Sequence, residues 1–263
     1  MRSCFEQASI AVTSGIVRAL WLQASAGVTY AGVAPNLLVS AWADQSGNNH
    51  NFSQATDAKK FTFQPTGSPF VFPTVSMTAQ GTNNDVLMTS DDNFKIAPPY
   101  TLLMCMSGIQ TVGSEQFIGV LGDFNASIIN TGAVKEWDHY QPWQAGNNPS
   151  GADDLNGIGL LAFLIVGFVV NPTGFCRSFY ANMTPGSALT VVTDFGVAAD
   201  TDSGLSLLGS NNFTSANTAT PSAYSGSIAE LILLPSDYGY DGTTWDPTTG
   251  LTSEVTRLQN TYG

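Results

Sequence analysis

The stretch WADQSGNNH, residues 42–50, takes a tryptophan directly into a run of polar residues. The run just before it, LLVSAWA at 37–43, has the composition of a β-strand, so Trp42 is expected to be the last inward-facing side chain of that strand. Residues 44–49 are expected to form a turn in which Gly47 and one asparagine take a positive φ. The nine residues therefore indicate a strand that ends at a tight turn.

Similar runs recur along the chain, separated by Gly, Asn, Asp and Pro. They include KFTFQP (60–65), FVFPTVSM (70–77), YTLLMCMSGIQ (100–110), FCRSFYANM (175–183) and ALTVVTDFGVA (188–198). Charged residues make up only 11% of the 263 residues, fewer than helix-rich proteins usually carry. Many short strands between such turn residues predict an all-β sandwich or barrel. No internal repeat, linker or shift in composition divides the sequence, so one domain is expected.

One helix is expected near residue 263, in the segment GLTSEVTRLQNTYG. Its apolar residues recur at helical spacing and share one face; they are Leu251, Val255, Leu258 and Tyr262. Thr252 or Ser253 is expected to cap the start of this helix, with Glu254 in its first turn, where the helix dipole favours an acidic side chain.

Five segments share a pattern with a known family. They are SGIVRALWLQAS (14–25), VSAWADQSGNNHNFSQAT (39–56), FYANMTPGSA (179–188), YSGSIAELILLP (224–235) and LTSEVTRLQNTYG (251–263). In this order they resemble strands, hairpins and the terminal helix of concanavalin A-like, laminin-G-like domains. The sequence departs from the pattern at Gln23, where the family often has Asp, and at Met183, where it often has Gly. The resemblance implies a two-sheet antiparallel jelly-roll sandwich with a short C-terminal helix, over residues 14–263, preceded by an N-terminal arm of residues 1–13.

The charge of the chain argues against two classes of partner. The net charge is −12, and the eight Lys and Arg residues are spread thinly. Binding to nucleic acid through its phosphates needs clustered positive charge, and an acidic surface disfavours anionic membranes. The longest apolar run, residues 157–170, is also too short to cross a bilayer as a helix, which needs roughly 20 residues.

Glu136 and Asp138 raise the question of catalysis. They are two residues apart and share one face if the segment is a strand. Retaining glycosidases of the same broad fold carry a Glu-x-Asp-x-x-Glu strand, which the segment EWDHYQ resembles. Its sixth residue is Gln141, however, and an amide cannot cycle a proton as the acid/base carboxyl must. The chain is therefore predicted not to be an enzyme.

The segment KEWDHYQPWQAGNNPSGADD, residues 135–154, also resembles the metal loops of legume lectins at its start. Pro142 then stands where those loops have Asn, and no histidine follows. Carboxylate and amide oxygens suit Ca²⁺, and the candidate ligands are Glu136, Asp138, Asn148 and Asp153. The alternative is a solvated acidic loop that binds no metal. No other cofactor is expected.

Aromatic residues crowd the same segment. Exposed rings can stack on sugars while asparagine bonds the hydroxyl groups. The candidate carbohydrate-binding residues are Trp137, His139, Tyr140, Trp143 and Asn147. The alternative is that the rings pack in the sandwich core or in an interface.

The run GIGLLAFLIVGFVV, residues 157–170, is apolar at both alternating sets of positions. A half-exposed strand would alternate, so this strand is expected to be covered on both faces. The cover comes either from the same chain, through the C-terminal helix or a long loop, or from another subunit. The candidate interface residues, which include apolar positions of the N-terminal arm, are Phe5, Ile10, Leu161, Phe163 and Ile165.

Modules with this resemblance are mostly recognition or structural domains of cell or virion surfaces. The sequence begins without a secretion signal, yet it has the Ser/Thr/Asn-rich, charge-poor composition of an extracellular module. A particle assembled in the cytoplasm reconciles the two. We therefore expect a non-catalytic virion surface protein, such as a phage capsid decoration or fibre component. Its expected partners are other virion proteins, copies of itself and cell-surface glycans. The alternatives are a free or secreted carbohydrate-binding lectin and, third, a glycoside hydrolase.

Overall fold

The computed structural model describes residues 16–66, 70–77, 88–92, 94, 96, 99–107, 114–121, 124–130, 135–140, 153–154, 163–172, 175–196, 205–208, 226–240, 243–246 and 251–263. The described elements are strands apart from the short 3-10 helix η1 (Asp57–Lys59) and the C-terminal helix α1 (Leu251–Tyr262). Every pairing between these strands is antiparallel. The predicted all-β jelly-roll sandwich with a C-terminal helix is thus confirmed. Within these ranges no helix has the length and apolarity to span a membrane.

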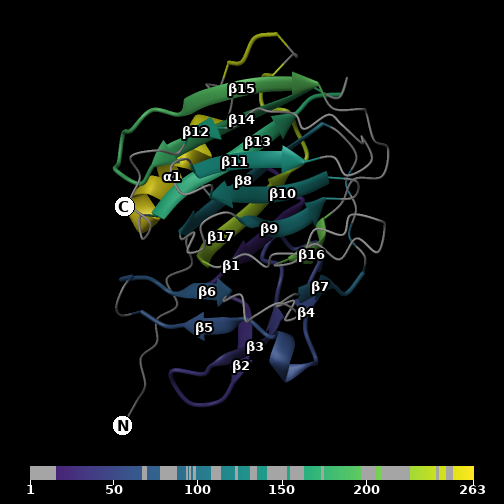
Figure 1. Ribbon diagram of the computed structural model, residues 1–263, viewed down its shortest axis with the longest axis vertical. Helices are drawn as coiled ribbons and strands as arrows, with labels where there is room; N and C mark the ends of the chain where they lie inside the picture. Colours follow the sequence, from purple (N-terminus) through teal and green to yellow (C-terminus); the bar gives the residue numbers. More distant parts are fainter. Residues whose placement is uncertain are drawn as a thin grey trace.

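One sheet carries α1 on its outer face, and we call it the helix-backed sheet (Figure 1). Its strands lie in the order β1 (Leu20–Gln23), β17 (Gly226–Leu234), β8 (Tyr100–Ser107), β13 (Phe163–Val170), β14 (Phe175–Asn182) and β15 (Thr190–Gly196). The strands β8, β13 and β17 are buried along almost their whole length.

The remaining strands continue the hydrogen-bonded ladder and supply the opposing layer. They run in the order β12 (Asp153–Asp154), β11 (Lys135–Tyr140), β10 (Phe124–Asn130), β9 (Ser114–Leu121), β16 (Leu205–Leu208), β7 (Met88–Ser90), β4 (Phe52–Ser53) and β3 (Leu38–Trp42). Strand β3 also pairs with β2 (Val28–Ala31) and with β5 (Thr62–Gln64). Strand β6 (Thr74–Met77) links β5 to β17 and so joins the two layers.

Each central strand of the helix-backed sheet divides its side chains between two cores. On β13, Val166 and Phe168 enter the core between the layers, whereas Ile165 and Val169 enter a second core beneath α1. Because side chains alternate along a strand, a strand that feeds both cores must be apolar at every position. This confirms that the strand within the apolar run 157–170 is covered on both faces, and α1 supplies the second cover. Residues 157–162 lie outside the described residues.

A β-bulge in β17 breaks the alternation at one place. Ile228 pairs with Met106 and Glu230 pairs with Cys105, so Ala229 and Glu230 together oppose a single residue of β8. Ala229 packs in the core beneath α1, and Glu230 bonds to residues of α1. An extra residue in one strand is what allows two consecutive side chains to face the same way. The bulge therefore brings a carboxylate under the helix without displacing the apolar residues that follow.

Helix α1 packs by the face predicted from the sequence. Its buried apolar side chains are Leu251, Val255, Leu258 and Tyr262. Full burial of such a side chain stabilises the fold by about 1.5–3 kcal/mol, so this face supplies most of the free energy that docks the helix. Glu254 lies in the first turn as expected. The expected cap is wrong, because the helix already begins at Leu251, so Thr252 and Ser253 lie inside its first turn.

The turn after β3 has the expected conformation and ties β1 to β3. Trp42 is fully buried, Gly47 has a φ of 91° and Asn49 has a φ of 65°. Asp44 Oδ1 accepts the backbone N–H of Trp21 at 2.9 Å and that of Ser46 at 2.8 Å. The carboxylate thus accepts backbone N–H groups both of the turn and of β1, as aspartate side chains in turns commonly do.

Gly167, in the middle of β13, provides a test of this packing. A Cβ atom there would lie 2.1 Å from the carbonyl oxygen of Leu102 and 2.6 Å from Cζ of Phe179. Overpacking of this kind costs about 1–3 kcal/mol or more, so Gly167→Ala should lower the free energy of unfolding, measured in urea, by about that amount. The control Thr29→Ala, at an exposed position of β2, should cost less than about 1 kcal/mol. A Gly167→Ala variant as stable as the parent would contradict the close approach of β8 and β14.

Candidate functional site

The residues proposed from the sequence for sugar and metal binding fall on two neighbouring strands or outside the described residues. Strand β11 contains Glu136, Trp137, Asp138, His139 and Tyr140, and β12 contains Asp153. Trp143, Asn147 and Asn148 lie outside the described residues. The two strands pair so that Glu136 is opposite Asp154 and Trp137 is opposite Asp153. The backbone thus brings these acidic positions together, and their role in binding stays a prediction.

Calcium binding by these residues also stays a prediction. Among the side chains that the structure describes, no group of three or more His, Cys, Asp or Glu residues could hold a metal ion. The side chains of β11 and β12 are not among them. In the observed register, Asp154 rather than Asp153 is the cross-strand partner of Glu136.

The predicted interface residues divide in a similar way. Phe5, Ile10 and Leu161 lie outside the described residues. Ile165 has no exposed surface, and Phe163 is 8% exposed. Both belong to the core beneath α1, so their cover comes from within the chain. Ile165 in particular has no surface left for contact with another subunit.

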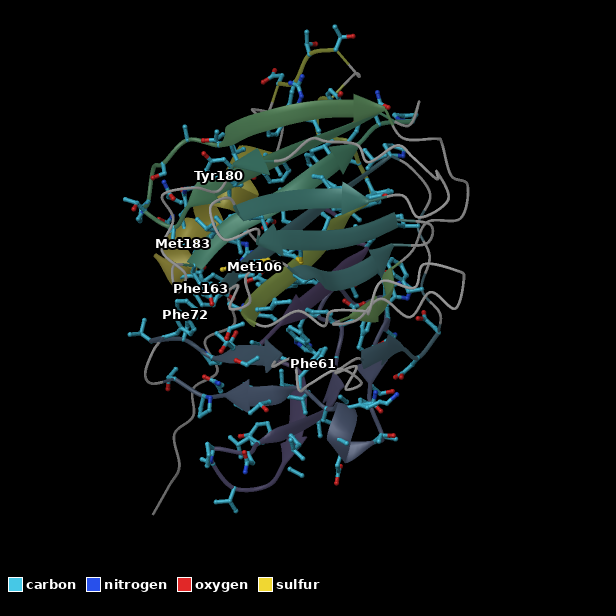
Figure 2. All side chains as sticks on the ribbon, viewed as in Figure 1. Phe61, Phe72, Met106, Phe163, Tyr180 and Met183 are labelled. Carbon is cyan, nitrogen blue, oxygen red and sulfur yellow. The ribbon has the colours of Figure 1, made fainter. Side chains whose placement is uncertain are left out.

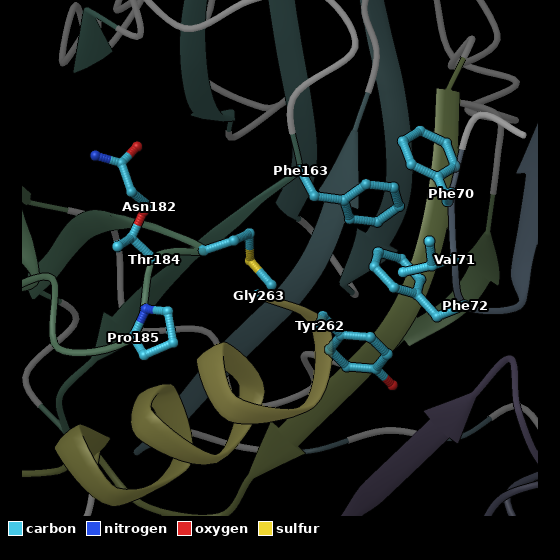
Figure 3. A pocket seen from close by; sticks show the side chains of 10 residues that line it. Phe70, Val71, Phe72, Phe163, Asn182, Thr184, Pro185, Tyr262 and Gly263 are labelled. Carbon is cyan, nitrogen blue, oxygen red and sulfur yellow. The ribbon is translucent and has the colours of Figure 1, made fainter.

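An open pocket of about 710 Å³ lies at the C-terminal end of α1. Three parts of the chain enclose it: the segment 70–72 before β6, the hairpin between β14 and β15, and residues 262–263, with Phe163 of β13 between them (Figure 3). Figure 2 shows Phe72, Phe163 and Met183 gathered at this side of the molecule. The volume is in the range of sites for small organic ligands.

One wall of the pocket is aromatic. Phe163 meets the edge of Phe70 at 4.4 Å and that of Phe72 at 4.9 Å between ring centroids, with the rings nearly perpendicular. Phe72 also packs against Tyr262 at 4.9 Å. Edge-to-face contacts of this kind fix the ring planes. Phe70 and Phe72 are only partly buried, so they offer ring surface to a ligand.

The opposite wall is the β14–β15 hairpin. Asn182, Thr184 and Pro185 are exposed there, and Met183 is partly buried. The wall therefore carries an amide and a hydroxyl group, which donate and accept hydrogen bonds. The hairpin lies across the pocket from the phenylalanine rings, and the Asn182 amide points away from them (Figure 3).

Gln259 of α1 holds this hairpin in place. Its Nε2 donates to the carbonyl oxygen of Asn182 at 2.9 Å and to that of Ser187 at 3.0 Å, and its Oε1 accepts the N–H of Gly186 at 3.3 Å. Gln259 is only 1% exposed, and a buried amide that is bonded at both ends is hard to displace. Gln259 is thus a positioning residue for the pocket. The helical pattern alone did not single it out, because it lies beside the apolar face.

Gly263 lines the pocket and packs closely against the backbone of the β14–β15 hairpin. A Cβ atom at this position would lie 2.0 Å from the carbonyl oxygen of Met183 and 2.5 Å from that of Gln259. Only glycine allows the backbone after α1 to approach the hairpin so closely.

A buried charge cluster fixes the helix that carries Tyr262 and Gln259. Glu230 and Glu254 have fully buried side chains; Arg257 pairs with both of them, and Arg18 pairs with Glu254. The indole N–H of Trp21 donates to Glu230 at 2.6 Å.

The hydroxyl group of Tyr262 completes the cluster by donating to Glu230 at 2.7 Å. Arg18 lies over the ring of Trp21, 4.5 Å from its centroid, and Arg257 lies 5.8 Å from it. The cluster thus joins β1, β17 and α1.

The cluster also sets the protonation of its members. Burial alone would lower the pKa of Arg257, but the charges and hydrogen bonds of Glu230 and Glu254 raise it above its usual value. Burial raises the pKa of Tyr262, and the neighbouring Glu230 raises it further. Arg257 therefore stays charged and Tyr262 stays a hydrogen-bond donor at neutral pH.

The comparisons with known proteins show the fold. No protein-family model matches the chain, and no curated protein sequence matches it. Among solved structures, the chain is similar to botulinum neurotoxin type C, which depends on interaction with two ganglioside molecules to enter cells. The TM-score is 0.51 at 13% identity, over 94% of this chain and 51% of that one.

Two further structures are similar. The binding domain of botulinum neurotoxin DC in complex with SialylT gives a TM-score of 0.51 at 11% identity, over 94% of this chain and 51% of that one. Domain 4 of a GH43 extracellular arabinanase from Geobacillus stearothermophilus, in complex with arabinotriose, gives 0.46 at 15% identity, over 84% and 98%. The chain thus spans about half the length of the neurotoxin chains. It has the lectin-like β-sandwich fold. At such low sequence identity the similarity shows the fold alone.

Glu230→Gln tests the charge cluster. Removing one partner from a buried ion pair leaves the other charge uncompensated, which costs about 3–5 kcal/mol. We expect the free energy of unfolding to fall by about that amount in chemical denaturation. The control is Asp57→Asn, which breaks the pair with Lys60. Asp57 is largely exposed, so that change should cost less than about 1 kcal/mol. Equal effects of the two substitutions would contradict the role given to Glu230.

Proposed function

We propose that the chain is a non-catalytic carbohydrate-binding module and that the pocket beside the end of α1 holds the sugar. The observation that carries the proposal is a pocket with the partly exposed rings of Phe70 and Phe72 on one side and a polar hairpin rim that includes Thr184 on the other. A sugar ring has apolar C–H faces and a rim of hydroxyl groups. Aromatic rings suit the faces, while amide and hydroxyl groups suit the rim.

The rigidity of the walls supports the same proposal. The aromatic rings are held by edge contacts with Phe163, and the hairpin is held by Gln259. A site that is already ordered loses little conformational entropy when a ligand binds. An uncharged ligand such as a sugar gains most from this arrangement, because each of its contacts is weak.

The fold is in keeping with a lectin-like role. One neurotoxin of similar fold interacts with gangliosides. We also propose that the chain belongs with the concanavalin A-like, laminin-G-like domains. The support is the order of the sequence segments and the confirmed strand, turn and helix in residues 38–50 and 251–262.

Substitutions in the pocket test the proposal. Phe70→Ala should weaken the binding of oligosaccharides found on a glycan array by about tenfold, since the lost ring contact is worth about 1–1.5 kcal/mol. Thr184→Val should also weaken binding, by removing the hydroxyl group at the pocket rim. The measurement is calorimetric titration, with a melting curve for each variant.

The matched control is Tyr30→Ala. Tyr30 is 46% exposed and stacks on Phe63, away from the pocket residues, so its loss should leave binding unchanged. Binding that survives both pocket substitutions would move the sugar site elsewhere, with β11 as the first alternative.

The bound oligosaccharides should be recovered intact, because Gln141 stands where a glycosidase needs its acid/base. Turnover that Glu136→Gln abolishes would instead make the chain a hydrolase.

We propose further, from composition and charge, that the module is carried on the surface of a virion. The N-terminal arm, with Phe5 and Ile10, would attach it to other virion proteins or to copies of itself. Deleting residues 2–12 should leave the melting temperature within a few degrees of the parent and reduce incorporation into particles. A full-length chain that is absent from purified particles and monomeric at high concentration would favour a free lectin.

A further inference from the structure

No side chain that lines the pocket is charged, in the part of the chain that the structure describes. The residues that line it are aromatic, aliphatic, amide or hydroxyl-bearing, and none is Lys, Arg, His, Asp or Glu. Proteins bind carboxylates and phosphates mainly through arginine, lysine or clustered backbone N–H groups. The pocket lining therefore offers hydrogen bonds without a counter-charge.

The described arginines nearby are committed elsewhere. Arg18 and Arg257 form the charge cluster with the buried Glu230 and Glu254, on the far side of Tyr262 from the pocket lining. Arg177 lies over the ring of Tyr240, 4.9 Å from its centroid. Moving Arg257 toward a ligand would strand the carboxylate of Glu230 in the core, which is costly. These side chains are thus held away from any anion in the pocket.

An acidic sugar would meet two penalties here. Its carboxylate would lose water against phenylalanine rings without gaining a positive partner. It would also approach a chain of net charge −12, whose field repels anions. An uncharged sugar meets neither penalty, and the Thr184 hydroxyl group at the pocket rim can donate a hydrogen bond to the sugar or accept one from it.

We infer that the pocket takes a neutral oligosaccharide and discriminates against its sialylated or otherwise anionic forms. The inference rests on the proposed function and narrows its ligand class. The volume of about 710 Å³ is large enough for a ligand of more than one sugar ring. Selectivity comes from a lining whose described side chains carry no counter-charge, which disfavours the anionic ligand rather than favouring the neutral one.

The test compares one oligosaccharide with and without a terminal sialic acid. The neutral form should bind at least about tenfold more tightly, because an unpaired anion in the site is penalised. Its affinity should be the same at low and high salt, since no charge pair is screened. Equal affinity for the two forms, or preference for the sialylated one, would overturn the inference and leave the proposed function intact. Failure of every glycan to bind would overturn both.

A charge-insertion variant provides an independent arm. Thr184→Arg places a guanidinium group at the exposed edge of the pocket and should strengthen binding of the sialylated form by about tenfold at low salt. High salt should remove most of the gain. The matched control is Thr29→Arg, which adds the same charge at an exposed position of β2 outside the pocket and should leave the ratio of affinities unchanged. If both variants gained the same affinity for the sialylated form, selectivity would depend on net charge, and the role of the pocket lining would be overturned. Melting curves identify a misfolded variant, and the wild-type comparison stands without it.

Discussion

The rest of the structure depends on one interaction, in which two buried glutamates between β1, β17 and α1 pair with two partly buried arginines. Buried ion pairs add little net stability, because the loss of hydration offsets their attraction. The apolar face of α1 supplies the docking energy, but apolar contacts are not directional and would tolerate a shift of the helix along the sheet. Charge-assisted hydrogen bonds tolerate no such shift. The cluster therefore determines where α1 lies, and with it the positions of Gln259 and Tyr262.

Much of the fold could be predicted from local patterns. The turn after Trp42, the helix face through Leu258 and the doubly covered strand near Ile165 each depend on residues close in sequence. Their geometry follows from backbone preference and from the alternation of apolar residues, which a sequence displays directly. The capping residue of α1 was predicted wrongly. Thr252 and Ser253 are both good caps in isolation, but the helix already includes Leu251 before them.

The pocket could not be predicted in the same way. Phe70, Phe163, Asn182 and Tyr262 are far apart in sequence and meet only through long-range strand pairing. Residues 135–154 predicted a site instead, because their aromatic and acidic residues are adjacent in sequence. The bulge at Ala229 and Glu230 was equally hidden, since only the register with Cys105 reveals the extra residue. The sequence did contain one sign of the pocket. Phe70 and Phe72 are two residues apart, so in an extended segment both rings lie on the same side.

The pocket built from these distant segments also connects ligand binding to the state of the helix. If α1 separates from the sheet, Tyr262 and the support of Gln259 for the hairpin are lost together. A ligand that needs both must therefore oppose local opening of the C-terminal helix more strongly than opening of elements far from the pocket. Occupancy of the pocket and protection of the helix amides from hydrogen exchange are then two readings of one equilibrium. The C-terminal helix therefore serves both the packing of the fold and the proposed binding surface.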